Sequence, residues 1–293
     1  MIDSLLLIFL ILAACFTPIF AKVSVSEISP LSFGFLRFGA ASLLFFITLK
    51  VRKGNLKFER GDYPRLMLLG LLCIPINQFF FLKGIQLSYA SHSGVIYSLN
   101  PVFAYLIAIY LKQEKFYLSK LVAILLTIIG VFFVFYDAFT KSTNGSPLAA
   151  GDILLIFAVL SFSLYLSLGK VMITKYGALK ANTFVFLIGS LFYIPLFIYD
   201  VHNLTLTYLT YHGIIGYLFL TIIVAFLAYL VWYYALKTIP VSRLTTMSNI
   251  SPVLTVFFSI IFLSEKVSIY FIIGGIIALI GVFIMHKVSL ELT

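Results

Sequence analysis

Ten long apolar segments occupy most of this 293-residue chain. Each is about 18–24 residues long, close to the ~20 residues that an α-helix needs to cross a bilayer. They lie near residues 4–22, 31–51, 63–84, 91–111, 118–137, 151–172, 181–200, 213–236, 241–263 and 267–286. With 62% hydrophobic and only 10% charged residues, the chain has too little polar surface to cover a soluble body. The sequence therefore predicts an all-α integral membrane protein with ten transmembrane helices.

The chain also contains an internal duplication, in which matching residues are separated by 151 positions, as Pro101 is from Pro252. The same offset relates Ser91 to Ser242, Glu114-Lys115 to Glu265-Lys266, and Gly130 to Gly281. We therefore predict two repeats, residues 1–140 and 141–293, within one integrated membrane domain. Because each repeat would span the membrane five times, the copies must be inverted relative to each other. Inverted repeats are typical of secondary transporters.

Basic residues are concentrated in alternate loops. One set of loops carries Lys50, Arg52, Lys53, Lys57, Arg60, Arg65, Lys112, Lys115, Lys120, Lys170, Lys175, Lys180, Lys237, Arg243 and Lys287. The other set carries only Lys22, Lys83, Lys141 and Lys266. The positive-inside rule makes the first set cytoplasmic, which predicts a multi-pass membrane protein with both termini inside. The net charge of +10 thus reports topology, and we expect no nucleic-acid partner because the cations are dispersed.

The polar residues form no recognisable catalytic motif, and we expect no enzyme, no cofactor and no metal site. The histidines, at helix ends or in loops, are His92, His202, His212 and His286. Neither a metalloprotease motif, a nucleophile elbow nor a phosphate-binding glycine loop is present in the sequence. All acidic residues, Asp137 and Asp152 among them, are expected in loops or at helix boundaries. Cys15 and Cys73 lie inside predicted helices, which argues against a structural disulfide.

Two segments carry a family resemblance. Gly84–Lys115 reads GIQLSYASHSGVIYSLNPVFAYLIAIYLKQEK, and Ala235–Lys266 reads ALKTIPVSRLTTMSNISPVLTVFFSIIFLSEK. Their Ser-rich helix starts, mid-helix prolines, terminal glutamates and following Gly-rich helices resemble the two EamA repeats of the drug/metabolite transporter superfamily. Arg37, in Phe35-Leu36-Arg37-Phe38, resembles the second-helix arginine of that family.

This resemblance covers essentially the whole chain. It implies ten helices in two inverted five-helix repeats, residence in the inner membrane, and transport of small metabolites, often outward. His92 and Arg243 depart from the pattern, because small residues are commoner at those positions in the family.

The two mid-helix prolines indicate where a substrate path would lie. Pro101 cannot donate a hydrogen bond to the carbonyl of Tyr97, and Pro252 likewise frees the carbonyl of Ser248. Free backbone groups at membrane depth are tolerated only where protein or a water-filled cavity satisfies them. The fourth and ninth helices are therefore expected to face a shared polar space. An ordinary proline kink, satisfied by neighbouring helices, is the alternative.

Polar and aromatic side chains accompany both prolines. The candidate substrate-binding residues are Asn77, Gln78, Tyr97, Asn100, Tyr229, Trp232, Ser248 and Asn249. Amides that faced lipid would be costly, so these are expected to point inward, with hydrogen bonding between helices as the competing role. The aromatic residues would offer amphipathic walls suited to an amino-acid-like or aromatic solute.

Three residues within the apolar segments, Arg37, Lys83 and His92, are candidates for attracting or coupling charge. For Arg37 we favour a structural role near the outer interface, and for Lys83 the simpler interpretation is snorkelling toward headgroups. No carboxylate is expected at mid-membrane, which argues against an Asp/Glu proton relay. Facilitated diffusion, exchange, and coupling through His92 all stay open.

The sequence thus predicts a secondary transporter that moves a small amino-acid-like or aromatic metabolite across the cytoplasmic membrane, outward, by alternating access. Three alternatives are a multidrug or cationic-amphiphile exporter, a nucleotide or cofactor importer, and a membrane-embedded enzyme or assembly subunit. A cation exporter would be expected to use a buried acidic residue. The expected partners are the small-molecule substrate and the lipid bilayer, for a monomer or weak homodimer.

Overall fold

The computed structural model describes residues 2–112, 114–142, 147–204, 209–232 and 250–291, and within these ranges the regular structure is entirely helical. Eight helical spans are long and apolar enough to cross a membrane, and two shorter apolar helices, Ile250–Leu263 and Ile269–Met285, accompany them. Each of the ten predicted segments therefore contains a helix. The prediction of an all-α membrane protein with about ten helices is confirmed.

The helices are α1 (Ile2–Glu27), α2 (Pro30–Val51), α3 (Tyr63–Leu71), α4 (Asn77–Leu87), α5 (Ala90–Ile96), α6 (Asn100–Tyr110), α7 (Leu118–Ser142), α8 (Leu148–Tyr176), α9 (Ala178–Asp200), α10 (Tyr211–Leu218), α13 (Ile250–Leu263) and α14 (Ile269–Glu291). Short 3₁₀ turns are η1 (Arg60–Asp62), η3 (Tyr97–Leu99) and η4 (Val201–Asn203), and π-helical turns are η2 (Leu72–Ile76) and η5 (Phe219–Ala228).

The two π-helices interrupt the third and eighth spans at related positions. The 151-residue offset carries Leu72 onto Ile223 and Ile76 onto Leu227, so that η2 falls inside η5. In η2 the cause is visible, because Pro75 removes a backbone donor from the helix. A π-turn widens the helix and alters its hydrogen-bond ladder, which makes backbone carbonyls available to side chains of neighbouring helices.

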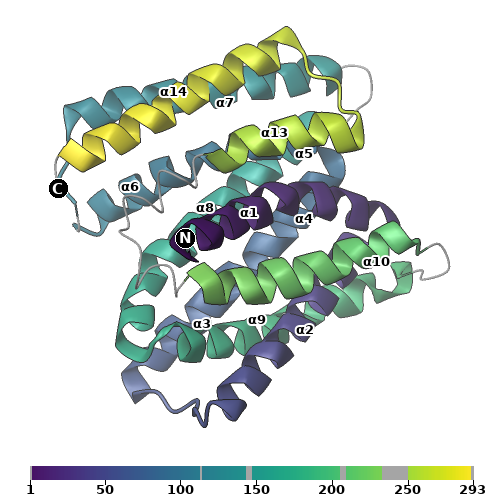
Figure 1. Ribbon diagram of the computed structural model, residues 1–293, viewed down its shortest axis with the longest axis vertical. Helices are drawn as coiled ribbons and strands as arrows, with labels where there is room; N and C mark the ends of the chain where they lie inside the picture. The colour runs from purple at the N-terminus through teal and green to yellow at the C-terminus, as the bar shows by residue number, and fades with distance from the viewer. Residues whose placement is uncertain (1, 113, 143–146, 205–208, 233–249, 292–293) are drawn as a thin grey trace.

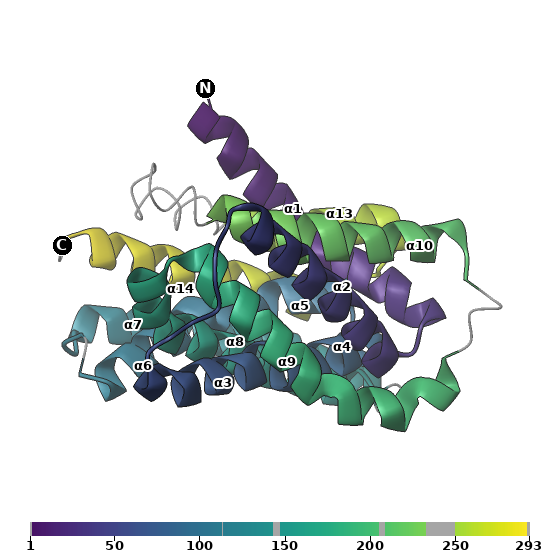
Figure 2. The same cartoon turned by 90° about the horizontal axis from the view of Figure 1, so that it is seen from below.

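The helices lie side by side, with α7 and α14 paired along one edge and α2, α3 and α9 along the opposite edge (Figure 1). Between these edges α4 packs on α8, and α13 packs on both α1 and α5. The first turns of α1 project from the body of the bundle (Figure 2). Large apolar side chains such as Leu43, Phe132 and Phe283 stay exposed on the outside, as expected for surfaces that contact lipid.

Contacts of Ser88, between α4 and α5, show that the two halves run in opposite senses. Its carbonyl oxygen accepts a hydrogen bond from Lys22 near the end of α1, and its hydroxyl donates to Asp152 near the start of α8. The helix that opens the first half therefore finishes where the helix that opens the second half begins. We call this end of the bundle the Glu265 end, and the opposite end, where α8 finishes, the Lys175 end.

The bounds of α7 and α8 correct one expectation from the sequence. Asp137 and Asp152 lie inside these helices rather than at their boundaries, and their side chains are only 2% and 0% exposed. The helix continues past Asp137 because Lys141, one turn later, pairs with its carboxylate at 2.8 Å. The chain therefore does contain buried carboxylates.

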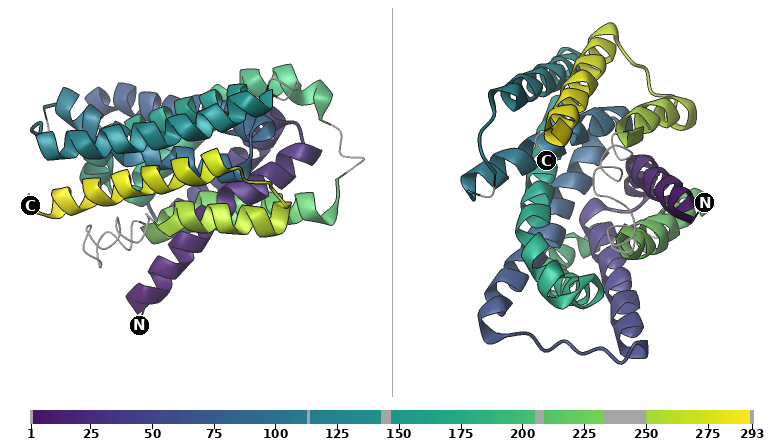
Figure 3. Two further views of the ribbon diagram at one scale, coloured as in Figure 1. Left: turned by 90° about the horizontal axis from the view of Figure 1, so that it is seen from above. Right: turned by 60° about the vertical axis from the view of Figure 1, so that its left-hand side comes forward.

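Glycines allow α7 and α14 to approach closely, as the two views of Figure 3 show. A Cβ atom added at Gly274 would lie 2.5 Å from the carbonyl oxygen of Gly130, a separation that real Cβ atoms essentially never show. At the adjacent Gly275 the nearest atom would be a methyl carbon of Val95 at 3.6 Å, an ordinary contact. The backbones of the two helices thus touch at Gly274 and leave room at Gly275.

We predict opposite outcomes for the same substitution at these adjacent glycines. Gly274→Ala should push α7 and α14 apart and cost about 1–3 kcal/mol, the usual range for overpacking. Gly275→Ala should be neutral or slightly stabilising, since alanine is the better helix former. Thermal unfolding of the purified protein in detergent measures both. Equal melting temperatures for the two variants would contradict the close approach at Gly274.

Candidate functional site

The fourth span is broken at Pro101, where α5 ends at Ile96, η3 follows, and α6 begins at Asn100. The backbone N–H of Asn100 donates to the carbonyl of Tyr97, so a 3₁₀ hydrogen bond satisfies the group that Pro101 cannot reach. The expectation of a free Tyr97 carbonyl is therefore wrong. Pro252 lies in the first turn of α13, while Ser248 and Asn249 lie outside the described residues.

Arg37 is the centre of a polar network in the interior of the bundle. Its side chain is 3% exposed, and its Nε donates to the carbonyl of Leu220 in η5 at 3.1 Å. Its Nη1 lies 3.4 Å from Oε1 of Gln78. Gln78 in turn donates to Oδ1 of Asn77 at 2.6 Å, and Asn77 donates to the carbonyl of Ala158 on α8 at 2.8 Å.

Two of the predicted aromatic residues lie around the same guanidinium. Tyr97 and Tyr229 are close enough to Arg37 to interact with it electrostatically. The ring of Tyr97 packs against Phe81 with centroids 6.0 Å apart, and that of Tyr229 packs against Phe186 at 5.1 Å. The structure thus brings Asn77, Gln78, Tyr97 and Tyr229 together around Arg37, and we call these five residues the Arg37 cluster.

The electrostatics of this cluster are unbalanced. Arginine keeps its charge in proteins, and a buried charge is costly unless it is paired. Within the part of the chain that the structure describes, Arg37 is held by a carbonyl and an amide oxygen, and no carboxylate pairs with it. Arg37 lies seven residues into α2, about 10 Å from the Glu265 end by the α-helical rise. The bundle therefore holds a positive charge that its described residues do not neutralise.

The remaining predicted residues lie around this cluster or apart from it. Asn100 is half-buried, and its side-chain oxygen accepts a hydrogen bond from Ser163 on α8 at 2.6 Å. Asn77 and Asn100 thus both bind α8, so contact between helices is at least one role of these amides. Trp232 is half-buried at the end of the eighth span, and Lys83 is half-buried on α4.

Two buried hydroxyls of the fourth span lack hydrogen-bond partners among the described residues. Ser93 on α5 is 0% exposed and Ser98 in η3 is 3% exposed. The Oγ atom of each finds no hydrogen-bond partner among the described residues. Buried polar atoms are nearly always satisfied, so these two hydroxyls are free to bind a further polar group as far as the described residues are concerned.

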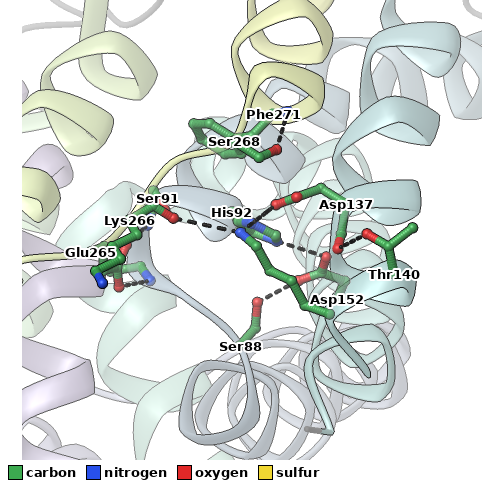
Figure 4. A network of polar contacts seen from close by, with 12 residues as sticks. Ser88, Ser91, His92, Asp137, Thr140, Asp152, Glu265, Lys266, Ser268 and Phe271 are labelled. Carbon is green, nitrogen blue, oxygen red and sulfur yellow. Dashed lines mark hydrogen bonds and ion pairs between the residues drawn. The ribbon is translucent and has the colours of Figure 1, made fainter. Parts of the chain in front are cut away.

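A second polar cluster lies at the Glu265 end (Figure 4). His92 on α5 lies between two carboxylates, with Nδ1 2.9 Å from Oδ2 of Asp152 and Nε2 3.4 Å from Oδ2 of Asp137. Lys141 lies 2.8 Å from the same Asp137 oxygen, and the hydroxyl of Ser88 donates to the other oxygen of Asp152. The His92 ring stacks on Phe271 of α14 at 5.1 Å. We call His92, Asp137, Asp152, Lys141 and Ser88 the His92 cluster.

Charged side chains also hold the two helix ends beside this cluster. Glu265 accepts hydrogen bonds from the backbone N–H groups of Ala90 and Ser91, which open α5, at 2.7 and 2.9 Å. Lys22 donates to the carbonyls of Ile85, Gln86 and Ser88, which close α4, at 2.9, 3.0 and 2.5 Å. An anion at a helix start and a cation at a helix end both complement the helix dipole.

Sequence reasoning missed the His92 cluster because it placed Asp137 and Asp152 at helix boundaries. One signal was present, the Asp137–Lys141 spacing of four residues, which favours a helix that continues past residue 137. No sequence pattern predicts the contact between Arg37 and Gln78, since that contact depends on how α2 packs on α4.

Comparison with known proteins places the chain among transporters. The EamA-like transporter family matches twice, over residues 2–136 and 149–286. An uncharacterized transporter of Archaeoglobus fulgidus is 26% identical over 266 residues, which is 91% of each chain. The uncharacterized transporter YetK of Bacillus subtilis is 26% identical over 85% of this chain and 76% of its own length.

A solved crystal structure shares the fold, with a TM-score of 0.65 over 99% of this chain and 98% of the other, at 14% identity. Because the family matches cover both halves of the chain, they include the spans that carry the Arg37 cluster and the His92 cluster. The protein is a multi-pass membrane protein that belongs to the EamA-like transporter family.

Proposed function

We propose that this transporter moves a small, amino-acid-like metabolite bearing a carboxylate outward across the inner membrane by alternating access. The observation that carries this proposal is the buried charge of Arg37, which is held among the described residues by two neutral oxygens and the ring of Phe38, with no carboxylate. A guanidinium binds carboxylates in a bidentate geometry, and such charge-assisted hydrogen bonds are the strong ones. A substrate carboxylate would neutralise Arg37 and explain why the chain tolerates it there.

The neighbours of Arg37 suit the rest of such a substrate. Gln78 and Asn77 offer amide groups, and Tyr97 and Tyr229 offer aromatic walls with polar ends. The hydroxyls of Ser93 and Ser98, which find no partner in the described part of the chain, add polar groups along the fourth span. Because Arg37, Asn77 and Gln78 are buried, the helices around them must part on one side for a substrate to reach them, as alternating access requires.

The alternatives fit less well. A cationic drug would be repelled by Arg37, and the buried carboxylates Asp137 and Asp152 are already paired with His92 and Lys141. A phosphate-bearing metabolite is the second candidate, because a guanidinium also binds phosphate well. We place the Lys175 end in the cytoplasm from the loop charges, and with it both termini. The proposal treats the working unit as one chain of two repeats, as a monomer or weak homodimer.

We predict that binding depends on the carboxylate and on Arg37. Amino acids and other small carboxylates should raise the melting temperature of the purified protein, since a ligand at 100 times its Kd stabilises by about 2.7 kcal/mol. The methyl esters of the same compounds should give no shift. Arg37→Gln should abolish the response to carboxylates, and Arg37→Lys should keep part of it. Equal shifts from acids and esters would reject the carboxylate, and shifts from phosphate compounds alone would favour the second candidate.

Topology can be tested with two single cysteines in a background without Cys15 and Cys73. Asn55, between α2 and α3, and His202, at the end of α9, are both exposed at opposite ends of the bundle. Asn55→Cys should react with a membrane-impermeant maleimide only after the cells are opened, because its loop carries the basic residues. His202→Cys should react in intact cells. The reverse pattern would invert the proposed orientation.

Transport without chemistry is the third expectation of this proposal. In proteoliposomes the purified chain should move a carboxylate identified by thermal shift, with a saturable rate, and should release it unmodified as judged by mass spectrometry. Protein-free liposomes and the Arg37→Gln variant serve as controls. Covalent change of the solute by the purified chain would favour a membrane-embedded enzyme instead.

A further inference from the structure

The geometry points to a second ligand of this protein, a proton. We propose that the His92 cluster is a proton-binding site, occupied while the Glu265 end is closed and emptied when that end opens to water. The site is separate from the Arg37 cluster, which lies deeper in the bundle. Only the statement that the Glu265 end faces the outside rests on the proposed function.

The first argument is hydrogen bonding. A neutral imidazole carries one N–H and can donate to only one acceptor. Both ring nitrogens of His92 face a carboxylate oxygen, at 2.9 Å from Asp152 and 3.4 Å from Asp137. Both contacts are hydrogen bonds only if the ring carries two protons, or if one carboxylate carries a proton and donates it to the ring. Either assignment gives the cluster one exchangeable proton.

The sum of the charges also indicates that the cluster holds one exchangeable proton. Asp137 and Asp152 supply two negative charges at 2% and 0% exposure, and Lys141 supplies one positive charge. One additional proton makes the cluster neutral, and without it a net negative charge would be buried away from water. Burying an uncompensated charge is costly enough that a protein binds a proton instead.

The charged groups around the His92 cluster do not change the number of protons that make it neutral. Glu265 faces α5 but is bound by two backbone N–H groups, and Lys22 from α1 is bound by three backbone carbonyls. Lys266 contributes its backbone carbonyl, 3.5 Å from the amine of Lys141. The remaining neighbours of His92 are the rings of Tyr89 and Phe271.

The position of the cluster links the proton to conformation. His92 and Asp137 belong to the first half and Asp152 to the second, so the cluster joins the halves at the end where Glu265 of the second half also binds α5 of the first. Opening of this end would separate α5 from α8 and α13, on which it packs. Water would then solvate both carboxylates, and the reason to hold the extra proton would disappear. Closing therefore takes up one proton, and opening releases it.

Hydrogen exchange of the full-length protein in lipid nanodiscs tests this linkage without any substrate. The readout is the backbone exchange of residues 88–96, corrected for the intrinsic pH dependence of amide exchange. For the wild type, opening linked to one proton should increase with pH by up to about tenfold per pH unit. The amides of Ala90 and Ser91, which Glu265 holds, should show this most clearly.

Asp152→Asn and Asp137→Asn separate a proton site from a merely structural contact. Each variant leaves one carboxylate and Lys141, a pair that is neutral without the extra proton, and each amide can donate to a neutral imidazole. Both should therefore exchange slowly at every pH. Asp200→Asn is the matched control, because Asp200 is a buried carboxylate at the same end that binds Ser32. It should keep the pH dependence of the wild type.

Three outcomes would overturn the proposal. They are a wild type whose corrected exchange is independent of pH, asparagine variants that keep the wild-type pH dependence, and asparagine variants that exchange rapidly at every pH. The last result would show that the cluster only holds the helices together and binds no exchangeable proton. Since one folded asparagine variant suffices, the loss of the other to misfolding leaves the test intact. Failure of carboxylate binding would sink the proposed function and leave this result unaffected.

Discussion

The hydrogen bonds of Lys22 and Glu265 to the ends of α4 and α5 are the interaction on which the rest of the structure depends. A helix end leaves several carbonyls or N–H groups without partners, and within a membrane protein they must be satisfied by protein where water is excluded. Lys22 provides for three carbonyls and Glu265 for two N–H groups. Because these side chains come from α1 and from the segment before α14, the turn between α4 and α5 is tied to both halves of the chain.

The two polar clusters solve the problem of buried charge in different ways. The His92 cluster gathers charges of both signs, so its groups neutralise one another in place. The Arg37 cluster offers neutral oxygens and aromatic rings, and the carbonyl that binds Arg37, that of Leu220, belongs to the π-helical turn η5. A cluster whose charges neutralise one another suits a contact that joins helices. A cluster with one charge left unneutralised suits a site that binds a charged ligand.

Hydropathy was enough to locate the eight spans and the two shorter apolar helices of the described residues, because crossing the bilayer demands a long apolar helix whatever the helix packs against. The ends of α7 and α8 were misplaced, since polar residues such as Asp137 and Lys141 pair within the helix and let it continue. The candidate site was found in part. Asn77, Gln78 and Tyr97 were identified from a proline and the cost of exposed amides, but their relation to Arg37 depends on packing between distant helices. The π-turn in η5 contains no proline, and periodicity could not reveal it.

The close approach of α7 and α14 follows the internal duplication of the sequence. A Cβ at Gly130 would meet Gly274 and Ala278, and a Cβ at Gly281 would meet Ala123 and Thr127. The 151-residue offset exchanges these two sets, turning Ala123 into Gly274, Thr127 into Ala278 and Gly130 into Gly281. A contact that maps onto itself in this way is isologous, the kind that two identical subunits form about a twofold axis. The two repeats thus meet at α7 and α14 in the way that two identical subunits meet at a twofold axis, but within one chain.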